Sequence, residues 1–215
     1  MITFIVGAMI ESPDYLKNTI NSFSEDLFII ACDKGYEHVL EAKLSADVII
    51  GDFDSASKEL PSGILDDANV IKLNPIKDDT DIEAALKYAF KNTTGDIIIL
   101  GALGGRVDHS LGNIALLGMG LKEGRKVYLQ DRLNRLQMLQ EGQKLVVSIH
   151  EQYGKYISVF PYQSTACVTM EGFKYPLQCA NVEGFNTLTV SNEIVDSYGS
   201  IFVESGYLLV CECAD

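Results

Sequence analysis

The sequence predicts a chain of two parts, an N-terminal α/β domain with a largely parallel six-stranded sheet and an all-β C-terminal domain of the sandwich or jelly-roll type. Two observations lead to this fold class. Up to about residue 130, short apolar runs alternate with segments of helical spacing, as in parallel strands joined by crossover helices. From about residue 145, helical spacing disappears and short strand-like runs follow one another. The polar segment 140–143 separates the two patterns, so we expect domains at 1–140 and 141–215.

Six apolar runs account for the predicted parallel sheet, and four helical segments lie between them. The runs are rich in Ile, Val and Leu, as strands buried between two layers of helices are. The third helix begins with Thr80-Asp81-Ile82-Glu83, which matches a capping box. We expect strands at 2–6, 27–31, 48–50, 70–73, 97–100 and 126–129, and helices at 11–23, 36–44, 80–95 and 110–122.

The second domain carries short strand-like runs only. Runs of this length with turn residues between them are typical of antiparallel sandwiches and jelly rolls. We expect strands at 145–149, 156–160, 166–170, 187–190, 200–204 and 207–211.

The chain of 215 residues carries a formal net charge of −13. Surfaces that bind nucleic acid or anionic membranes need an excess of Lys and Arg, so we expect neither as a partner. No apolar stretch approaches the ~20 residues of a membrane span, and the first residues lack the basic start of a signal peptide. The five cysteines form an odd set without paired Cys-x-x-Cys spacing. We therefore expect reduced, mainly structural thiols and a cytoplasmic location.

A pair of acids, Asp52 and Asp54, directly follows the predicted strand 48–50. Carboxylates held this close repel each other, which favours a bound cation or a raised pKa. An oxygen-only pair suits Mg²⁺, which takes one or two carboxylates and leaves its other positions to water and phosphate oxygens. A solvated Asp-Ser turn is the alternative interpretation of these two residues alone.

Further acids follow two other predicted strands, the second and the fourth. In open α/β sheets ligands bind beyond the carboxyl ends of the strands, so all of these acids are expected to converge on one crevice. The sequence therefore predicts a metal and phosphate site at this edge of the sheet. The additional acids are Asp33, Asp78, Asp79 and Asp81.

A glycine-rich loop at 101–109 follows the fifth predicted strand and precedes a helix; it reads Gly-Ala-Leu-Gly-Gly-Arg-Val-Asp-His. Its glycines let backbone amides approach an anion, Arg106 can grip a phosphate, and the start of the helix favours negative charge. The Rossmann and P-loop patterns are absent from the sequence, and a plain glycine-rich turn stays open as an alternative. For His109 we expect a binding role, although a structural histidine is at least as common.

Together these motifs resemble those of the thiamine pyrophosphokinase family, in order and spacing, over nearly the whole chain. One difference stands at Lys34, because the family's usual Ala-Asp-Gly-Gly is Cys-Asp-Lys-Gly here. The segments that carry the resemblance are 32–35, 51–55, 77–81, 101–109 with Asn113, 172–177 and 191–192.

The resemblance implies transfer of the pyrophosphoryl group of ATP to the hydroxyl of thiamine, which gives thiamine diphosphate and AMP in a Mg²⁺-dependent reaction. It also implies a homodimer, with sites between the α/β domain of one subunit and the β domain of the other. The first domain would bind ATP and Mg²⁺ and catalyse; the second would bind thiamine and dimerise. The implied catalytic residues are Asp52, Asp54, Asp81, Arg106 and Asp108, of which Asp52, Asp54 and Asp81 hold the metal. The implied nucleotide-binding residues are Asp33, Asp78, Thr80, Gly104, Gly105, Arg106, His109 and Asn113, and Ser191 and Asn192 would meet thiamine.

Two other functions are compatible with parts of the sequence. The Asp-x-Asp pair is also the signature of haloacid-dehalogenase-like phosphatases, in which Asp52 would be the covalent nucleophile. That interpretation leaves the loop with Arg106 unexplained. The second alternative is a nucleotide or thiamine binding module without catalysis, which has less need for so many carboxylates.

Overall fold

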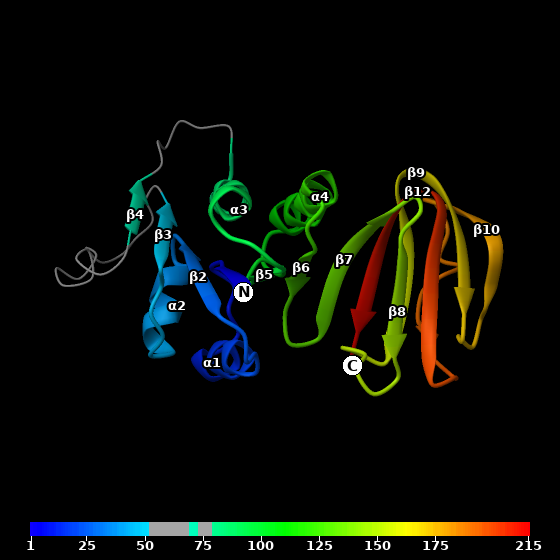
Figure 1. Cartoon of the computed structure of the whole chain (residues 1–215), viewed down its shortest axis with the longest axis horizontal. Coiled ribbons are helices and arrows are strands. Elements are labelled where there is room, and N and C mark those ends of the chain that lie inside the picture. The colour runs from blue at the N-terminus through cyan, green and yellow to red at the C-terminus, as the bar shows by residue number, and fades with distance from the viewer. Residues whose placement is uncertain (52–68, 73–78) are drawn as a thin grey trace. The chain divides into compact units, whose positions relative to one another are not determined.

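The computed structural model describes residues 1–51, 69–72 and 79–215 of the chain (Figure 1). These residues form two compact units, 1–132 and 133–215. The division falls before strand β7 (Asn134–Gln140), earlier than the boundary at 140 that the sequence suggests. The reason is that β7 pairs along its whole length with the last strand of the chain, from Asn134↔Cys213 to Gln140↔Tyr207.

In the first unit, each run predicted from the sequence is found as an element of the predicted type. The apolar runs become strands because their Ile, Val and Leu side chains are buried, and Ser12 and Thr80 cap two of the helices. The elements are β1 (Ile2–Val6), α1 (Pro13–Asn21), β2 (Leu27–Cys32), α2 (Gly35–Glu41), β3 (Val48–Gly51), β4 (Asn69–Lys72), α3 (Asp81–Asn92), β5 (Ile97–Leu100), α4 (Val107–Glu123) and β6 (Val127–Gln130).

The strands of this unit lie in the order β6-β5-β1-β2-β3-β4, and the pairings between neighbours are parallel. From β1 the chain steps outward through β2 and β3 to β4, and then returns to the other side of β1 with β5. The strand order therefore reverses between β1 and β5. In an open α/β sheet this switch point is where ligands bind, outside the carboxyl ends of the strands.

Helices cover both faces of the sheet. Phe4 and Val6 of β1 share one apolar cluster with Leu16 of α1 and Val39 of α2. Thr3 faces the other way, and its hydroxyl donates to Thr93 Oγ1 at the end of α3 over 2.8 Å. Burial on both faces is what a parallel sheet requires, and each fully buried Ile or Leu contributes about 1.5–3 kcal/mol to folding.

The second unit is built on two long antiparallel strands, β9 (Tyr156–Glu171) and β12 (Tyr198–Cys213). One end of β12 pairs with β8 (Lys144–Ser148) and the other end with β7. Likewise β10 (Leu177–Glu183) pairs with one end of β9 and β11 (Asn192–Glu193) with the other. Apolar side chains from both ends of both long strands share one core.

The structure differs from the sequence-based expectation in three places in this unit. Each long strand takes the place of two predicted strands, and bulges at 203–207, around Gly206 at φ +84°, mark the join in β12. The prediction of a strand at 187–190 is wrong, because the segment is a turn. The Thr189 hydroxyl in this turn donates to the Val159 carbonyl. Strands β7 and β10 were not predicted, because the Leu, Met and Gln of β7 favour helix and most side chains of β10 are exposed.

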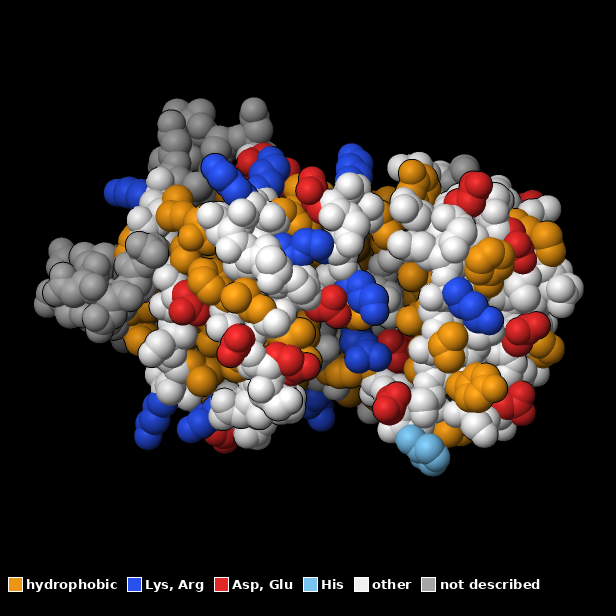
Figure 2. Space-filling view, in the orientation of Figure 1, with side chains coloured by type: hydrophobic (Ala, Val, Ile, Leu, Met, Phe, Trp, Pro, Cys, Tyr) orange, Lys and Arg blue, Asp and Glu red, His pale blue; other side chains and the backbone are white. Residues whose placement is uncertain are grey.

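On the face in view, the acidic and basic side chains of the described residues are interspersed (Figure 2). Among the described residues, no helix is long and apolar enough to cross a membrane.

Candidate active site

The carboxyl ends of β1 and β5 are joined through two glycines. The Gly7 N–H donates to the Leu100 carbonyl and the Met9 N–H donates to the Gly101 carbonyl, each over 2.8 Å. A Cβ on Gly7 would lie 2.6 Å from the Gly101 oxygen, so this approach requires glycine. The glycine-rich loop thus leaves β5 at the switch point of the sheet.

Two side chains of α4 hold this loop. Asn113 is buried, and its Nδ2 donates to the Ala102 carbonyl over 2.8 Å. The Ser110 hydroxyl accepts from the Gly104 N–H and donates to the Gly104 carbonyl, both over 3.2 Å. Gly104 and Gly105 have φ of +93° and +63°, which residues other than glycine rarely adopt. The loop conformation is therefore fixed by the helix that follows it.

The first N–H groups of helix α4 have a side-chain acceptor, Asp108 Oδ1, which accepts from the His109 N–H over 2.9 Å. The N-cap residue of α4, Arg106, makes no capping hydrogen bond. The first N–H groups of a helix lack partners within the helix, and its dipole favours negative charge at this end. A helix N-terminus whose N-cap residue makes no capping bond, behind a glycine-rich loop, is a suitable place for a phosphate group.

Arg106 and Asp108 form an exposed, two-pronged ion pair at this helix start. Arg106 Nη2 lies 2.6 Å from Asp108 Oδ2, and Nε lies 3.1 Å from Oδ1. The hydrogen bond and charge of Arg106 lower the pKa of Asp108, and Asp108 raises the pKa of Arg106 in return. The Asp108 carboxylate thus occupies the Nε and Nη2 edge of the guanidinium, which is the edge that an arginine can use to bind two phosphate oxygens.

The start of α3 is capped as the sequence predicts. The Thr80 hydroxyl accepts from the Glu83 N–H over 3.2 Å, which confirms this half of the capping box. The Glu83 carboxylate lies 3.0 Å from Lys87 Nζ, and Lys87 also donates to both oxygens of Asp79 over 2.8 Å. These hydrogen bonds, to Asp79 first and Glu83 second, raise the pKa of Lys87.

Two of the predicted acids lie near the carboxyl end of β2. Asp33 directly follows this strand with φ +43°, a conformation that Asp tolerates better than most residues, and its N–H donates to the Ile50 carbonyl over 3.0 Å. Asp81 is the first residue of α3, and its carbonyl accepts from Cys32 Sγ over 3.7 Å. The structure therefore brings the start of α3 next to the residue that precedes Asp33.

Three further predicted acids, Asp52, Asp54 and Asp78, lie outside the described residues. Within the parts of the chain that the structure describes, no group of three or more His, Cys, Asp and Glu side chains is arranged to hold a metal ion.

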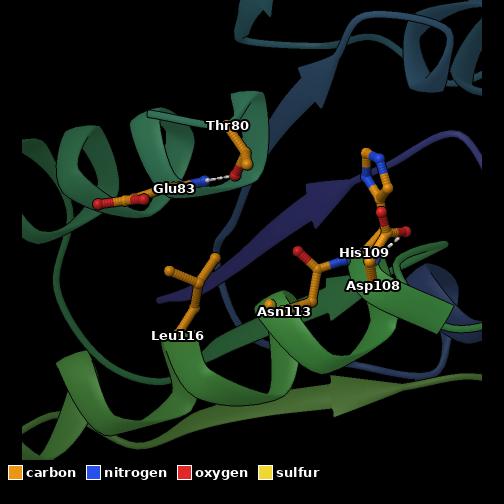
Figure 3. A pocket seen from close by; sticks show the side chains of 7 residues that line it. Thr80, Glu83, Asp108, His109, Asn113 and Leu116 are labelled. Carbon is orange, nitrogen blue, oxygen red and sulfur yellow. Dashed lines mark hydrogen bonds between the residues drawn. The ribbon is translucent and has the colours of Figure 1, made fainter. Parts of the chain in front are cut away.

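A cavity of about 230 Å³ lies between α3 and α4 (Figure 3). Asn113 and Leu116 project from α4 towards the α3 side, where Thr80 and Glu83 form the opposite wall. This volume is below the ~300 Å³ of typical small-molecule sites, so it accommodates a fragment such as a ribose or a phosphate group. The lining residues are Thr80, Glu83, Asp108, His109, Gly112, Asn113 and Leu116.

Four residues of the cavity and the loop were not predicted as site residues from the sequence. Glu83, Gly112 and Leu116 line the cavity, and Ser110 holds the loop. Leu116 lies one helical turn after Asn113, so helical spacing from that residue was a signal that would have found it. Ser110 carries no comparable signal, because its role depends on how the loop folds back.

The second unit contains the two residues expected to meet thiamine. Ser191 is exposed at φ +59°, and its N–H donates to Ser158 Oγ over 2.9 Å. It lines a cavity of about 590 Å³. Asn192 is buried instead: its Oδ1 accepts from the Tyr175 N–H over 3.0 Å, and its Nδ2 donates to the Tyr175 carbonyl over 2.8 Å. Asn192 thus holds the 172–177 segment in place.

Comparison with known proteins gives the class to which this fold and site belong. A family model described as "Thiamin pyrophosphokinase, catalytic domain" matches residues 20–129, within the first unit. A second model, "Thiamin pyrophosphokinase, vitamin B1 binding domain", matches residues 143–208, within the second unit. The protein is therefore a transferase that carries a catalytic domain followed by a vitamin-binding domain.

Individual relatives agree with the two models. The thiamine pyrophosphokinase of Bacillus subtilis (strain 168) is 34% identical over 188 residues, which are 86% of this chain and 87% of the relative. A crystal structure of the Bacillus subtilis enzyme matches with a TM-score of 0.88 and 31% identity, over 100% of both chains. That of Geobacillus thermodenitrificans matches with a TM-score of 0.83 and 31% identity, over 100% of this chain and 98% of that one. The chain belongs to the thiamin pyrophosphokinase family, whose members form thiamine diphosphate.

Proposed function

We propose that the protein transfers the pyrophosphoryl group of ATP to the hydroxyl of thiamine, with Mg²⁺, to give thiamine diphosphate and AMP. The observation that carries the proposal is the arrangement at the switch point. The fixed glycine loop, the start of α4 and Arg106 stand together at the carboxyl edge of the sheet. Family membership supplies the acceptor and the product.

The donor nucleotide is proposed to bind with its phosphates at the loop and the start of α4. Gly104 and Gly105 let the backbone approach the phosphates. The Arg106 guanidinium then releases the Asp108 carboxylate and donates to two phosphate oxygens, whose geometry is similar. This exchange replaces one charge-assisted pair with another. Thr80, His109 and Asn113 line the adjoining cavity, where a ribose or phosphate fits.

Mg²⁺ fits the chemistry of the acidic residues at this edge. Asp33 and Asp81 supply oxygen donors near the end of β2, and hard divalent cations prefer oxygen. We propose that Asp81 holds the ion with Asp52 and Asp54, and that Asp33 and Asp78 lie close by. When bound, the metal neutralises phosphate charge and so stabilises the negative charge of the transition state.

The reaction requires attack by the thiamine hydroxyl oxygen on the middle phosphorus of ATP, with AMP as the leaving group. Negative charge grows on the phosphate oxygens, so Arg106 contributes by electrostatic stabilisation from a fixed position. Asp108 or Asp81 orients the hydroxyl and accepts its proton. The departure of Asp108 from Arg106 when the nucleotide binds would make its carboxylate available for this role.

Thiamine is proposed to bind in the cavity of about 590 Å³ in the second unit, beside Ser191. Tyr156 and Phe160 line it with aromatic surface that suits the two flat rings of thiamine, and Ser158 adds a hydroxyl. Asp215 also lines this cavity, and its negative charge suits the positively charged thiazolium ring. Asn192 acts indirectly, because its amide groups are bonded to Tyr175.

We also propose a homodimer, a cytoplasmic location and no nucleic-acid or membrane partner. Large apolar side chains that are exposed in a single chain support the dimer, since such surface marks interaction sites. The pairing of the long strands and their common core supports a sandwich of jelly-roll type for the second unit and a six-stranded parallel sheet for the first. The exposed apolar side chains of the second unit include Val146, Tyr175, Phe185, Leu188, Val195 and Tyr198.

The test is to incubate the purified protein with ATP, Mg²⁺ and thiamine and to separate the products by chromatography. Thiamine diphosphate and AMP are expected in equal amounts, and AMP should not form without thiamine. Release of inorganic phosphate with a phosphoaspartate would instead favour the phosphatase, and binding without AMP would favour a binding module.

Matched variants assign the reaction to the proposed site. Asp54→Ala and Asp81→Asn are expected to lose turnover by 100-fold or more, a size that loss of a transition-state electrostatic contact can reach. Asp26→Asn is the control, because Asp26 is exposed and precedes β2 at the amino end of the sheet. Equal activity of Asp81→Asn and Asp26→Asn would contradict the assignment.

A further inference from the structure

Two cysteines of the second unit face each other outside the proposed site. Cys167 Sγ on β9 and Cys179 Sγ on β10 lie 3.0 Å apart, although the residues are 12 positions apart in the sequence. A disulfide bond is about 2.05 Å long, so the sulfur atoms need to approach by about 1 Å. The structure describes all five cysteines and contains no disulfide among them.

The local backbone turns the Cys179 side chain towards Cys167. Cys179 has φ +41° and stands at the register shift between β10 and β9, where the ladder is interrupted between Leu177 and Ala180. Its N–H donates to Thr169 Oγ1 over 3.0 Å, and that hydroxyl donates to Glu204 over 2.7 Å. These bonds hold the bulge in the conformation that brings the two thiols together.

The two thiols differ in exposure. Cys179 is exposed, whereas Cys167 is buried. The hydrogen bond with Cys179, and then burial, raise the pKa of Cys167 to about 11, so this thiol stays protonated near neutral pH. Because the thiolate is the reactive form and needs access to the oxidant, Cys179 is the cysteine that reacts first.

We propose that Cys167 and Cys179 form a reversible disulfide on exposure to a peroxide. The Cys179 thiolate attacks one peroxide oxygen, which gives a sulfenic acid and, from hydrogen peroxide, one water. The Cys167 sulfur then displaces the sulfenic oxygen, which leaves as a second water with the thiol proton, and the S–S bond forms. In total, two thiols are oxidised and one hydrogen peroxide is reduced to two waters.

The disulfide encloses the segment 172–177, which Asn192 holds through Tyr175. The proposed function, on which this step rests, places thiamine beside Ser191, the residue that precedes Asn192. The disulfide therefore restrains a segment that contacts the binding surface through Asn192. A surface that is already ordered loses less conformational freedom when its ligand binds. Oxidation is therefore expected to lower the KM for thiamine by at least twofold.

The first experiment follows the chemistry without using activity. The reduced full-length protein is treated with hydrogen peroxide, its remaining thiols are alkylated, and digested peptides are identified by mass spectrometry. We expect a cross-linked peptide pair that contains Cys167 and Cys179, a mass loss of about 2 Da on the intact chain, and reversal by dithiothreitol. Absence of this pair, or cross-links that join other cysteines or two chains equally often, would overturn the proposal.

Serine variants separate the two roles. Cys179→Ser is expected to slow the peroxide oxidation of Cys167 at least tenfold, because the remaining thiol is buried. In Cys167→Ser, oxidation of Cys179 is expected to stop at sulfenic or sulfinic acid, without a cross-link. Cys213→Ser is the matched control and should form the cross-link as the wild type does. Equal oxidation rates of Cys167 in Cys179→Ser and in the wild type would contradict the proposed order.

The kinetic experiment compares the KM for thiamine of the reduced and the cross-linked wild type. An unchanged KM would overturn the effect on thiamine binding, while the mass-spectrometric result would still establish the disulfide. Absence of thiamine diphosphate synthesis in both states would count against the proposed function alone.

Discussion

Replacement of Asn113 by Ala tests whether α4 holds the glycine loop. The buried Asn113 side chain donates to the Ala102 carbonyl over 2.8 Å. Its removal leaves this carbonyl without that donor, and an unsatisfied buried polar group costs about 1–3 kcal/mol. For a chain of this size, 1 kcal/mol corresponds to roughly 2–4 °C in Tm. We therefore expect a loss of about 2 kcal/mol, which corresponds to about 4–8 °C.

The assay combines thermal denaturation with the kinetics of AMP formation. A displaced loop misplaces the phosphates, so kcat/KM for ATP should fall at least tenfold. Asn92→Ala is the matched control, because Asn92 Nδ2 donates to the Tyr88 carbonyl over the same 2.8 Å but is exposed. That control should lose less than about 0.5 kcal/mol and no activity. Equal changes in Tm for the two variants, or full activity of Asn113→Ala, would refute the reasoning.

Variants at three other positions test separate parts of the structure. Thr80→Ala should lower the free energy of unfolding by about 1 kcal/mol, because the α3 cap is lost. Thr80→Ser keeps the hydroxyl and should retain most of this free energy; chemical denaturation measures both variants. Arg106→Gln should raise the pKa of Asp108, which Arg106 lowers, towards its ordinary value near 3.9. The Arg106–Asp108 pair stabilises the fold above about pH 4, and this stabilisation is lost as the pH falls through the lowered pKa of Asp108. A ¹³C titration of the Asp108 carboxyl group measures that pKa in both proteins. Glu212→Ala should cost about 3 kcal/mol in a denaturation experiment, because Glu212 is 1% exposed and accepts from Arg135 over 2.7 and 3.0 Å; a loss below about 1 kcal/mol would contradict this.

The first unit could be predicted from the sequence because its local signals agree with its tertiary contacts. Ile2–Val6 is apolar except for Thr3, and Ile97–Leu100 is a continuous apolar run; both are central strands, buried at every residue except Ile2. Thr80 carries a cap signal that the structure confirms. In such segments the pattern of apolar residues alone determines the element and its approximate ends.

The second unit was harder to predict because its contacts override local preference. The residues of β7 favour helix, but pairing with β12 makes them a strand. The segment 187–190 has an alternating pattern typical of a strand, yet it forms a turn in which the Val190 N–H donates to the Thr187 carbonyl over 3.2 Å. The Thr189 hydroxyl donates to the Val159 carbonyl and holds this turn against β9. Bulges that join two predicted strands into one leave little signal in the sequence.

The glycines, Arg106, Asp108 and Asn113 of the candidate site were named from the sequence, but Ser110 and Leu116 were not. Glycines and Arg106 after an apolar run are visible in the sequence, because their chemistry is unusual at that place. Ser110 and Leu116 are ordinary helix residues, and only the folded position of α4 gives them their roles. The turn of Glu83 towards Lys87 likewise depends on which partner lies within reach.

The central claim is that the carboxyl edge of the first sheet binds a divalent metal with the triphosphate. Paramagnetic Mn²⁺ with ATP, added to the ¹⁵N-labelled protein, broadens amide resonances near the ion. The account predicts selective broadening at Asp33, Asp81 and Gly105, while Asp26 and Asp96 at the amino edge keep sharp resonances. Broadening at the amino edge, or equal broadening at both edges, would contradict it.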